Sequence, residues 1–293
     1  MPPRPRSPRR TPKRVVWRRR LVAFGVLIVG FLVAWFAVES VGGGGSNPEP
    51  TTLAVAPRPF RVVFPEGFTR DQMAERVAAV AGIAERKRGK KVKLSSPAYL
   101  AATRRPRPEL GFGRRPLEGF LFPATYDFTA RTTSAQLAAK QLEAFRRNWS
   151  KLNLGYARSK NLTPYDVLII ASMVEKETLS PDERELVSAV IYNRLHKRMA
   201  LQIDATLRYG LHIPPTESIR LSQLESDNPY NTRKLPGLPP TPIANPGLAS
   251  LQAAAHPRHV DYLYFVRKPD KKHHFFTASF AEFERYKAEH GYP

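Results

Sequence analysis

The sequence predicts an α+β fold: one transmembrane helix near the N-terminus, then a small strand–helix unit, then a larger mixed part of buried helices and a few strands. Three observations support this. Residues 21–38 are eighteen uncharged residues, residues 60–64 alternate with period two, and residues 167–174 are apolar or small at every position. The 293 residues include no cysteine, which excludes a disulfide framework and a thiolate metal site.

The N-terminal region has the charge pattern of a membrane anchor. Residues 1–20 hold nine Arg or Lys and no acid, so we expect a basic cytoplasmic tail. Residues 21–38 have the length of a transmembrane helix, and the Gly- and Pro-rich residues 39–59 predict a flexible linker. The rest of the chain is then extracytoplasmic, in a single-pass protein with its N-terminus inside. A signal peptide cleaved near Ala37-Val38-Glu39 is the alternative, although this site is a poor cleavage motif.

The first folded elements are predicted to be a strand at residues 60–64 and a helix capped by Thr69 with Gln72. Gly82 is expected to end this helix. Residues 82–116 carry eleven Arg or Lys against two acids, which predicts a solvated and partly disordered surface loop. A net charge of +22 also invites a nucleic-acid hypothesis, but the extracytoplasmic location and the lack of a recognition motif argue against it. Anionic wall polymers or lipid headgroups are the expected counter-charges.

An aromatic stretch, LEGFLFPATYDF at residues 117–128, comes next. Its aromatic side chains are Phe120, Phe122, Tyr126 and Phe128. Two interpretations remain open: a strand pair packed on the core, or a set of rings that partly lines a sugar groove. A helix capped by Thr133 with Gln136 is then expected to run to about Trp149.

Residues 163–210 form the stretch around which the site is predicted. Thr163 and Pro164 start a helix without a polar face, and such a helix is buried. Its last turn nevertheless carries Glu175 and Glu177. Burial would hold such a carboxyl group protonated at neutral pH, and the larger apolar neighbours on the preceding turns favour Glu177. The alternative is that both are ordinary solvated carboxylates at a helix end.

The remaining elements are predicted from caps and turns. Ser180 with Glu183 predicts a capping box for a second helix. Residues 201–210 and the Pro-rich residues 228–247 are expected to be loops, the second one rigid. The C-terminal part predicts a helix, a hairpin and a last helix, at residues 247–255, 262–277 and 279–290. No HExxH motif accompanies the seven histidines, and Pro257 interrupts the spacing of His256 and His259, so no metal is predicted.

Several segments in the same order resemble the MltG/YceG-like family of endolytic murein transglycosylases. They are LEGFLFPATYDF, SMVEKET, VIYNRL, LQIDAT, DNPYNTRKLPGLPPTPIANPG and SLQAAAHPRHVDYLYFV, within about residues 60–285. In this family the second glutamate of the EKE triplet is the catalytic acid, which implies Glu177. The sequence departs from the family at Ile203 and Ala205, where a small polar residue and a proline are usual.

The resemblance implies a LysM-like subdomain with the basic loop at residues 60–130 and a catalytic transglycosylase domain at residues 131–293. It also implies a polar substrate-binding lining of Asn193, Gln202, Asp204, Tyr230, Asn231 and Thr232. The implied activity is lytic cleavage of the MurNAc–GlcNAc bond within glycan strands, which leaves 1,6-anhydroMurNAc ends and terminates nascent strands without a cofactor. The implied partners are peptidoglycan, the membrane and penicillin-binding proteins. A non-enzymatic wall-binding scaffold and a hydrolytic muramidase, with Asp204 as second carboxylate, are the alternatives.

Overall fold

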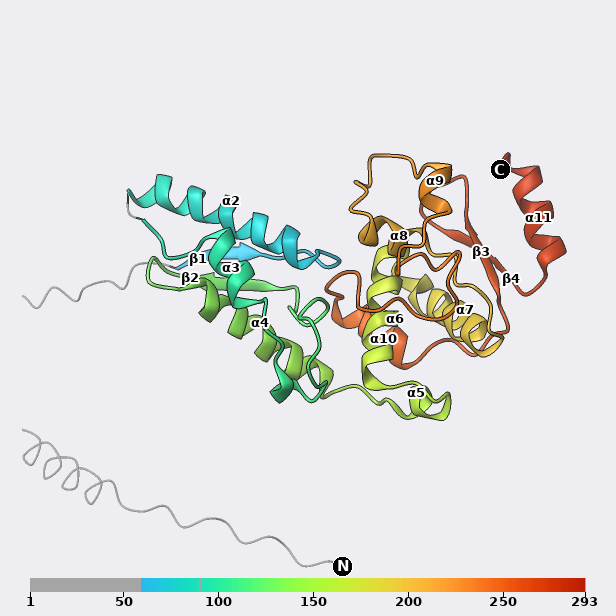
Figure 1. Cartoon of the computed structure of the whole chain (residues 1–293), viewed down its shortest axis with the longest axis horizontal. Helices are drawn as coiled ribbons and strands as arrows, with labels where there is room; N and C mark the ends of the chain where they lie inside the picture. The colour runs from blue at the N-terminus through green and yellow to red at the C-terminus, as the bar shows by residue number, and fades with distance from the viewer. Residues whose placement is uncertain (1–58, 90, 293) are drawn as a thin grey trace, which may run out of the picture. The chain divides into compact units, whose positions relative to one another are not determined.

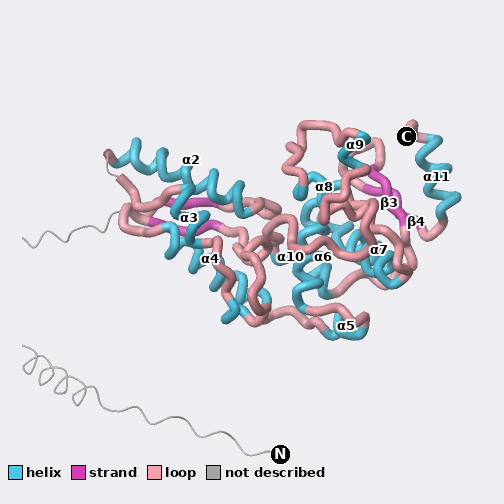
Figure 2. The backbone as a smooth tube through the Cα atoms, viewed as in Figure 1, coloured by secondary structure: helices cyan, strands magenta, loops and turns pink. Residues whose placement is uncertain are grey.

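The computed structural model describes residues 59–89 and 91–292. The predicted tail and span, and all but the last residue of the predicted linker, lie outside these ranges. Within them, no helix is both long enough and apolar enough to cross a membrane. The described elements are helices with two small sheets, so the predicted mixed α+β class is confirmed for this part of the chain (Figures 1 and 2).

A strand–helix unit opens the described chain. Its elements are β1 (Phe60–Val63), α2 (Arg70–Arg88), α3 (Ser96–Ala102), the 3₁₀ turn η1 (Pro108–Leu110) and β2 (Thr125–Phe128). The two strands are antiparallel, with Phe60 opposite Phe128 and Val63 opposite Thr125. Helices α2 and α3 follow one another between the strands in sequence and pack together (Figure 1).

The interior of this unit is a hydrophobic core that also takes residues from α4 (Ser134–Trp149). Val62, Met73 and Phe128 are almost completely buried, and burial of each such side chain contributes roughly 1.5–3 kcal/mol. Leu137 of α4 belongs to this core, whereas Phe145 on the same helix belongs to the next one. Helix α4 therefore ties the two halves of the described chain together.

The basic stretch is more ordered than expected. Helix α2 does not end at Gly82 but continues to Arg88, and Gly89 ends it with a left-handed φ of 62°. A glycine inside a helix costs about 1 kcal/mol relative to alanine. Here the extra turns bury Ala84 in the core beside Ala81, which offsets that cost. The prediction of a partly disordered loop over residues 82–116 is wrong for the described residues, since α2, α3 and η1 occupy much of it.

The larger part of the chain is built mainly of helices. Its elements are α5 (Gly155–Ser159), α6 (Pro164–Glu177), η2 (Pro181–Glu183), α7 (Arg184–His196), α8 (Asp204–Gly210), α9 (Leu221–Leu224), α10 (Leu248–Ala255), β3 (Tyr264–Arg267), β4 (His274–Thr277) and α11 (Phe280–Glu289). The predicted C-terminal hairpin is confirmed, with Tyr264 opposite Thr277 and Arg267 opposite His274.

Helix α6 is the centre of the second core. It packs against α10 and α7 (Figure 1). Every side chain from Val167 to Val174 is buried, as predicted. Thr163 caps the helix: its side chain accepts a hydrogen bond from the backbone of Asp166, whose carboxylate accepts one from the Thr163 backbone. A helix with no exposed stripe is held in place on all sides, so the groups at its C-terminal end have fixed positions.

Two local predictions in this part are wrong. Ser180 makes no capping bond to α7; its hydroxyl bonds Asp182, and a 3₁₀ turn precedes the helix. Glu183 instead accepts hydrogen bonds from the backbone N and from Nδ1 of buried His274, at 2.8 and 2.7 Å, so a tertiary contact outweighs the local cap. Residues 204–210, expected to be a loop, form helix α8.

Candidate active site

A cleft of about 1000 Å³ lies where the strand–helix unit meets the larger part of the chain. One wall is the first turns of α2, with Thr69, Asp71 and Glu75. Opposite are the end of α6, helix α8 with the loop that follows it, and Arg267 of β3. Two residues at the end of the buried helix α6, Lys176 and Glu177, line this cleft. The segment predicted to carry the chemistry therefore ends at a cavity.

Glu177 is the last residue of α6 and its environment changes its proton affinity. Burial, and then the negative charge of Asp204, raise the pKa of the Glu177 carboxyl to about 7. A backbone hydrogen bond from Ala205 and the positive charges of Arg267 and Arg233 act in the opposite direction. At neutral pH the group is therefore present in both its acid and its carboxylate forms. A general acid that donates a proton and then recovers one needs both forms.

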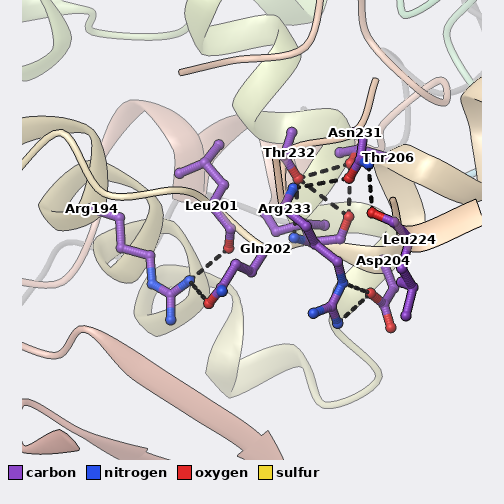
Figure 3. A network of polar contacts seen from close by, with 10 residues as sticks. Arg194, Leu201, Gln202, Asp204, Thr206, Leu224, Asn231, Thr232 and Arg233 are labelled. Carbon is purple, nitrogen blue, oxygen red and sulfur yellow. Dashed lines mark hydrogen bonds and ion pairs between the residues drawn. The ribbon is translucent and has the colours of Figure 1, made fainter. Parts of the chain in front are cut away.

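Asp204 lies at the first position of α8 and lines the same cleft. Its Oδ1 receives a hydrogen bond from Nε of Arg233 at 2.7 Å and forms an ion pair with Nη2 of the same guanidinium at 2.6 Å, and Figure 3 shows this two-point contact. Both side chains are partly exposed, so the pair contributes little to stability. Its effect is to fix the position of the Asp204 charge beside Glu177.

The loop before α8 is held by a buried arginine. Arg194 donates from Nη1 to the backbone oxygen of Leu201 at 2.8 Å and to Oε1 of Gln202 at 3.2 Å (Figure 3). It also donates to the backbone oxygen of Ala200 at 3.0 Å. Gln202 has a left-handed φ of 56°, and its backbone N donates to the carbonyl of Thr232. These contacts set the direction in which the chain enters α8.

Four of the predicted lining residues make hydrogen bonds inside the protein and do not line the cleft. Asn193 donates to the carbonyls of Val260 and Tyr262, and buried Asn231 donates to those of Leu224 and Ser226. The hydroxyls of Thr232 and Thr206 are 2.9 Å apart, and that of Tyr230 is 2.7 Å from Thr241. Gln202, held by Arg194, is also outside the cleft lining, so of the predicted set the structure brings Glu177 and Asp204 together.

Glu118 is a buried carboxyl behind the cleft that sequence reasoning missed. It is only 7 % exposed, and burial raises the pKa of this group to about 7. It accepts hydrogen bonds from the backbone N of Arg70, from Tyr209 and from Asn245. The sequence did contain a signal, because an acid between Leu117 and Phe120 in an aromatic stretch has to be paired if that stretch is buried.

The aromatic stretch itself packs in the interior. Phe120, Tyr126 and Phe128 are buried, and neither they nor Phe122 lines the cleft. This favours the core interpretation over the sugar-groove interpretation. For metal binding, the described residues contain no group of three or more His, Asp or Glu side chains placed to hold an ion.

Comparisons with known proteins show the family to which the chain belongs. The family model described as "YceG-like family" matches residues 49–289, which include every element of the cleft. The chain belongs to the YceG-like family. A crystal structure of a YceG-like protein from Listeria monocytogenes matches this YceG-like chain with a TM-score of 0.64 and 31 % identity, over 80 % of this chain and 77 % of that one.

Two relatives of the YceG-like chain carry the name endolytic murein transglycosylase. The protein from Bacillus subtilis (strain 168) is 39 % identical over 157 residues, which are 53 % of this chain and 43 % of that protein. The one from Streptococcus pneumoniae (strain ATCC BAA-255 / R6) is 32 % identical over 271 residues, or 85 % of this chain and 46 % of that protein. The YceG-like chain thus spans less than half the length of these relatives.

Proposed function

We propose that this chain is an endolytic murein transglycosylase that cleaves the MurNAc–GlcNAc bond inside peptidoglycan glycan strands, in line with the name that its relatives carry. The observation that carries the proposal is Glu177, fixed at the end of a buried helix, opening into a cleft and titrating near pH 7. A single carboxyl group suffices for this reaction because the substrate's own hydroxyl replaces water.

In the proposed mechanism Glu177 first acts as an acid and donates its proton to the leaving O4 of GlcNAc as the glycosidic bond breaks. As a carboxylate it then accepts the proton of the C6 hydroxyl of MurNAc, whose oxygen bonds to C1 and closes the 1,6-anhydro ring. The proton returns to Glu177, so the cycle needs no cofactor. The Ala205 hydrogen bond and Arg267 stabilise the carboxylate between the two steps.

A hydrolytic muramidase is the second candidate, because Asp204 lines the same cleft as Glu177. In that reaction Asp204 would activate water or bind the sugar covalently. The contact of Asp204 with Arg233 counts against it, because Oδ1 of Asp204 is already engaged by the guanidinium.

Mass analysis of the muropeptides from purified murein digested with the full chain separates these candidates. We expect 1,6-anhydroMurNAc ends, and reducing MurNAc ends carrying oxygen from ¹⁸O-water would support the muramidase. Asp204→Asn adds a matched arm: it should keep the anhydro product if Glu177 acts alone and abolish cleavage if Asp204 is the second catalytic carboxylate. Binding of murein without any cleavage would identify a scaffold protein.

The proposed setting is the outer face of the cytoplasmic membrane. The charge and length of residues 1–38 support a single-pass anchor with the N-terminus inside, and an enzyme that cuts peptidoglycan has to lie outside the cytoplasm. The strand–helix–helix–strand order of the first unit supports a LysM-like assignment. Wall-synthesis enzymes such as penicillin-binding proteins are the proposed partners, and nascent glycan strands are the proposed substrate.

A further inference from the structure

Glu118 joins the two walls of the cleft from behind. Its Oε1 is 3.0 Å from the backbone N of Arg70, the first residue of α2, and 2.8 Å from Nδ2 of Asn245. Its Oε2 is 3.2 Å from the hydroxyl of Tyr209, on α8. Tyr209 lines the cleft, as do the residues on either side of Arg70, so one buried carboxyl group contacts elements on both sides of the cavity.

Asn245 extends this network to the turn before α2. It donates from Nδ2 to the carbonyl of Phe68 at 2.9 Å, and its Oδ1 accepts from the backbone N of Leu121, also at 2.9 Å. Its backbone oxygen accepts from the N of Gly67 at 3.0 Å. Buried polar groups that are all paired in this way hold one arrangement, because any shift leaves a donor or acceptor unpaired.

Helix α8 carries the effect to the reacting group. Tyr209, near its C-terminal end, donates to Glu118, and Ala205, at its N-terminal end, lines the cleft with Glu177, whose pKa its backbone N–H lowers. Both residues belong to the same short helix, four positions and thus about one turn apart. A change in how Tyr209 is held therefore reaches the Ala205 N–H.

We propose that Glu118 is a positioning residue of the proposed reaction: through Tyr209 it holds α8 so that the Ala205 N–H meets Glu177, and through Arg70 it sets the opposite wall of the cleft. Glu118 does not touch the glycan in this role. The expected effect on the pH dependence of kcat/KM rests on the proposed transglycosylase function. The expected effect on the position of α8 rests only on contacts within the protein.

The test compares the pH dependence of kcat/KM for the full chain and for Glu118→Gln. Asp204, Arg267 and Arg233 are the charged groups that act on Glu177. If the substitution releases Tyr209, α8 can shift and the Ala205 N–H lowers the pKa of Glu177 less, so Glu177 holds its proton more tightly. The alkaline limb then moves up by about half to one pH unit, the equivalent of one hydrogen bond. Loss of a nearby negative charge alone would move it down, so the sign distinguishes the two effects.

Tyr209→Phe removes the same contact without changing any charge, and it should move the limb in the same direction. Tyr192→Phe is the matched control, since its buried hydroxyl donates to the carbonyl of Ala254, away from the cleft. A merely structural role for Glu118 would lower the amount of active protein and leave the limb in place. An unmoved limb in both Glu118→Gln and Tyr209→Phe overturns the proposal.

Amide hydrogen exchange of the peptide that spans residues 203–210 gives a readout without activity. Exchange should be faster in Glu118→Gln and Tyr209→Phe than in the unmodified chain, and unchanged in Tyr192→Phe. If the unmodified chain does not cut murein, the proposed function fails, and this measurement still decides whether Glu118 holds α8. Equal exchange in all four proteins would contradict the role of Glu118 even in an active enzyme.

Discussion

A carboxyl group that gives up and regains a proton at neutral pH needs a site that is apolar enough to favour the acid and polar enough to tolerate the carboxylate. The site of Glu177 meets both requirements. Burial at the end of α6 and the charge of Asp204 favour the acid, while the Ala205 N–H and Arg267 favour the carboxylate. The balance places its pKa at about 7, where the free energies of the two forms are equal.

At the residue scale, we predict that Glu177→Gln lowers kcat for murein cleavage by roughly 10²–10⁴-fold, because glutamine cannot transfer the proton. Glu175→Gln is the matched control, since Oε2 of Glu175 accepts a hydrogen bond from the backbone N of Gly247, at 3.0 Å, and does not line the cleft. It should keep most of the activity. Muropeptide release measures both variants, and thermal unfolding checks that both are folded. Comparable rates for Glu177→Gln and the unmodified chain would mean that another residue is the acid.

Single side chains were only partly predictable from the sequence. The unbroken apolar run of its helix favoured Glu177, and the resemblance of the EKE triplet to the family singled it out. Glu118 was not identified, because its partners Arg70, Tyr209 and Asn245 are far away in sequence and periodicity carries no information about them. Asn231 and Thr232 are polar side chains of the kind that lines a substrate cleft, but here their hydrogen bonds hold loops together.

At the scale of elements, local sequence signals such as helix caps predicted the structure correctly where no tertiary contact opposed them. The capping boxes at Thr69, Thr133 and Thr163 are all present, and each starts its helix as predicted. The signals failed at Gly82 and Ser180, where tertiary contacts were stronger. Burial of Ala84 extends α2 across its glycine, and the contact of Glu183 with His274 removes the acid that the capping box needs.

A second prediction concerns the packing of the aromatic stretch against the Pro-rich loop. Gly119 has a left-handed φ of 91°, and a Cβ there would lie 2.7 Å from the side chain of Pro242. Gly119→Ala should therefore lower the free energy of unfolding by about 2–4 kcal/mol, as strain and overlap add. Gly113 also has a left-handed φ, of 70°, but no atom within 4 Å of such a Cβ. Gly113→Ala should cost only the strain, roughly 1–2 kcal/mol.

Urea unfolding followed by circular dichroism gives both values for the Gly119 and Gly113 variants. Their difference isolates the contact with Pro242, because the backbone strain is common to both. Equal losses of stability would show that the aromatic stretch and the Pro-rich loop are not tightly packed.

At the scale of the molecule, positive charge is concentrated at one end of the strand–helix unit. The last turn of α2 is basic, and the guanidinium of Arg88 lies 4.0 Å from the centre of the Phe60 ring, at the start of β1. Exposed Lys91 and Lys93 follow directly. We call residues 86–88, 91 and 93 the basic end. The residues of α2 that line the cleft are at the opposite end of the helix.

We therefore predict that replacing the basic end with glutamine weakens binding of the full chain to anionic envelope material, and more so at low salt, where charge is less screened. Turnover of a short neutral glycan should change little. Glutamine in place of Arg104, Arg105 and Arg107, which are also exposed, is the control for loss of charge elsewhere, and it is compared with glutamine in place of Arg86, Lys87 and Arg88 alone. Co-sedimentation with wall fragments measures binding, and muropeptide release measures turnover. A collapse of turnover on the neutral glycan would assign the basic end to the active site.

The contacts of Asn245 also determine when, during synthesis of the chain, the walls of the cleft can be joined. Asn245 bonds to Phe68 and Glu118, which precede it by 177 and 127 positions. A chain grows from its N-terminus, and its early parts can fold while later ones are still missing. Helix α6 with Glu177 is thus made well before the residue that joins the walls of the cleft. For the proposed enzyme, a nascent or truncated copy that stops short of Asn245 would carry the proton donor without the contacts that join the walls of the cleft.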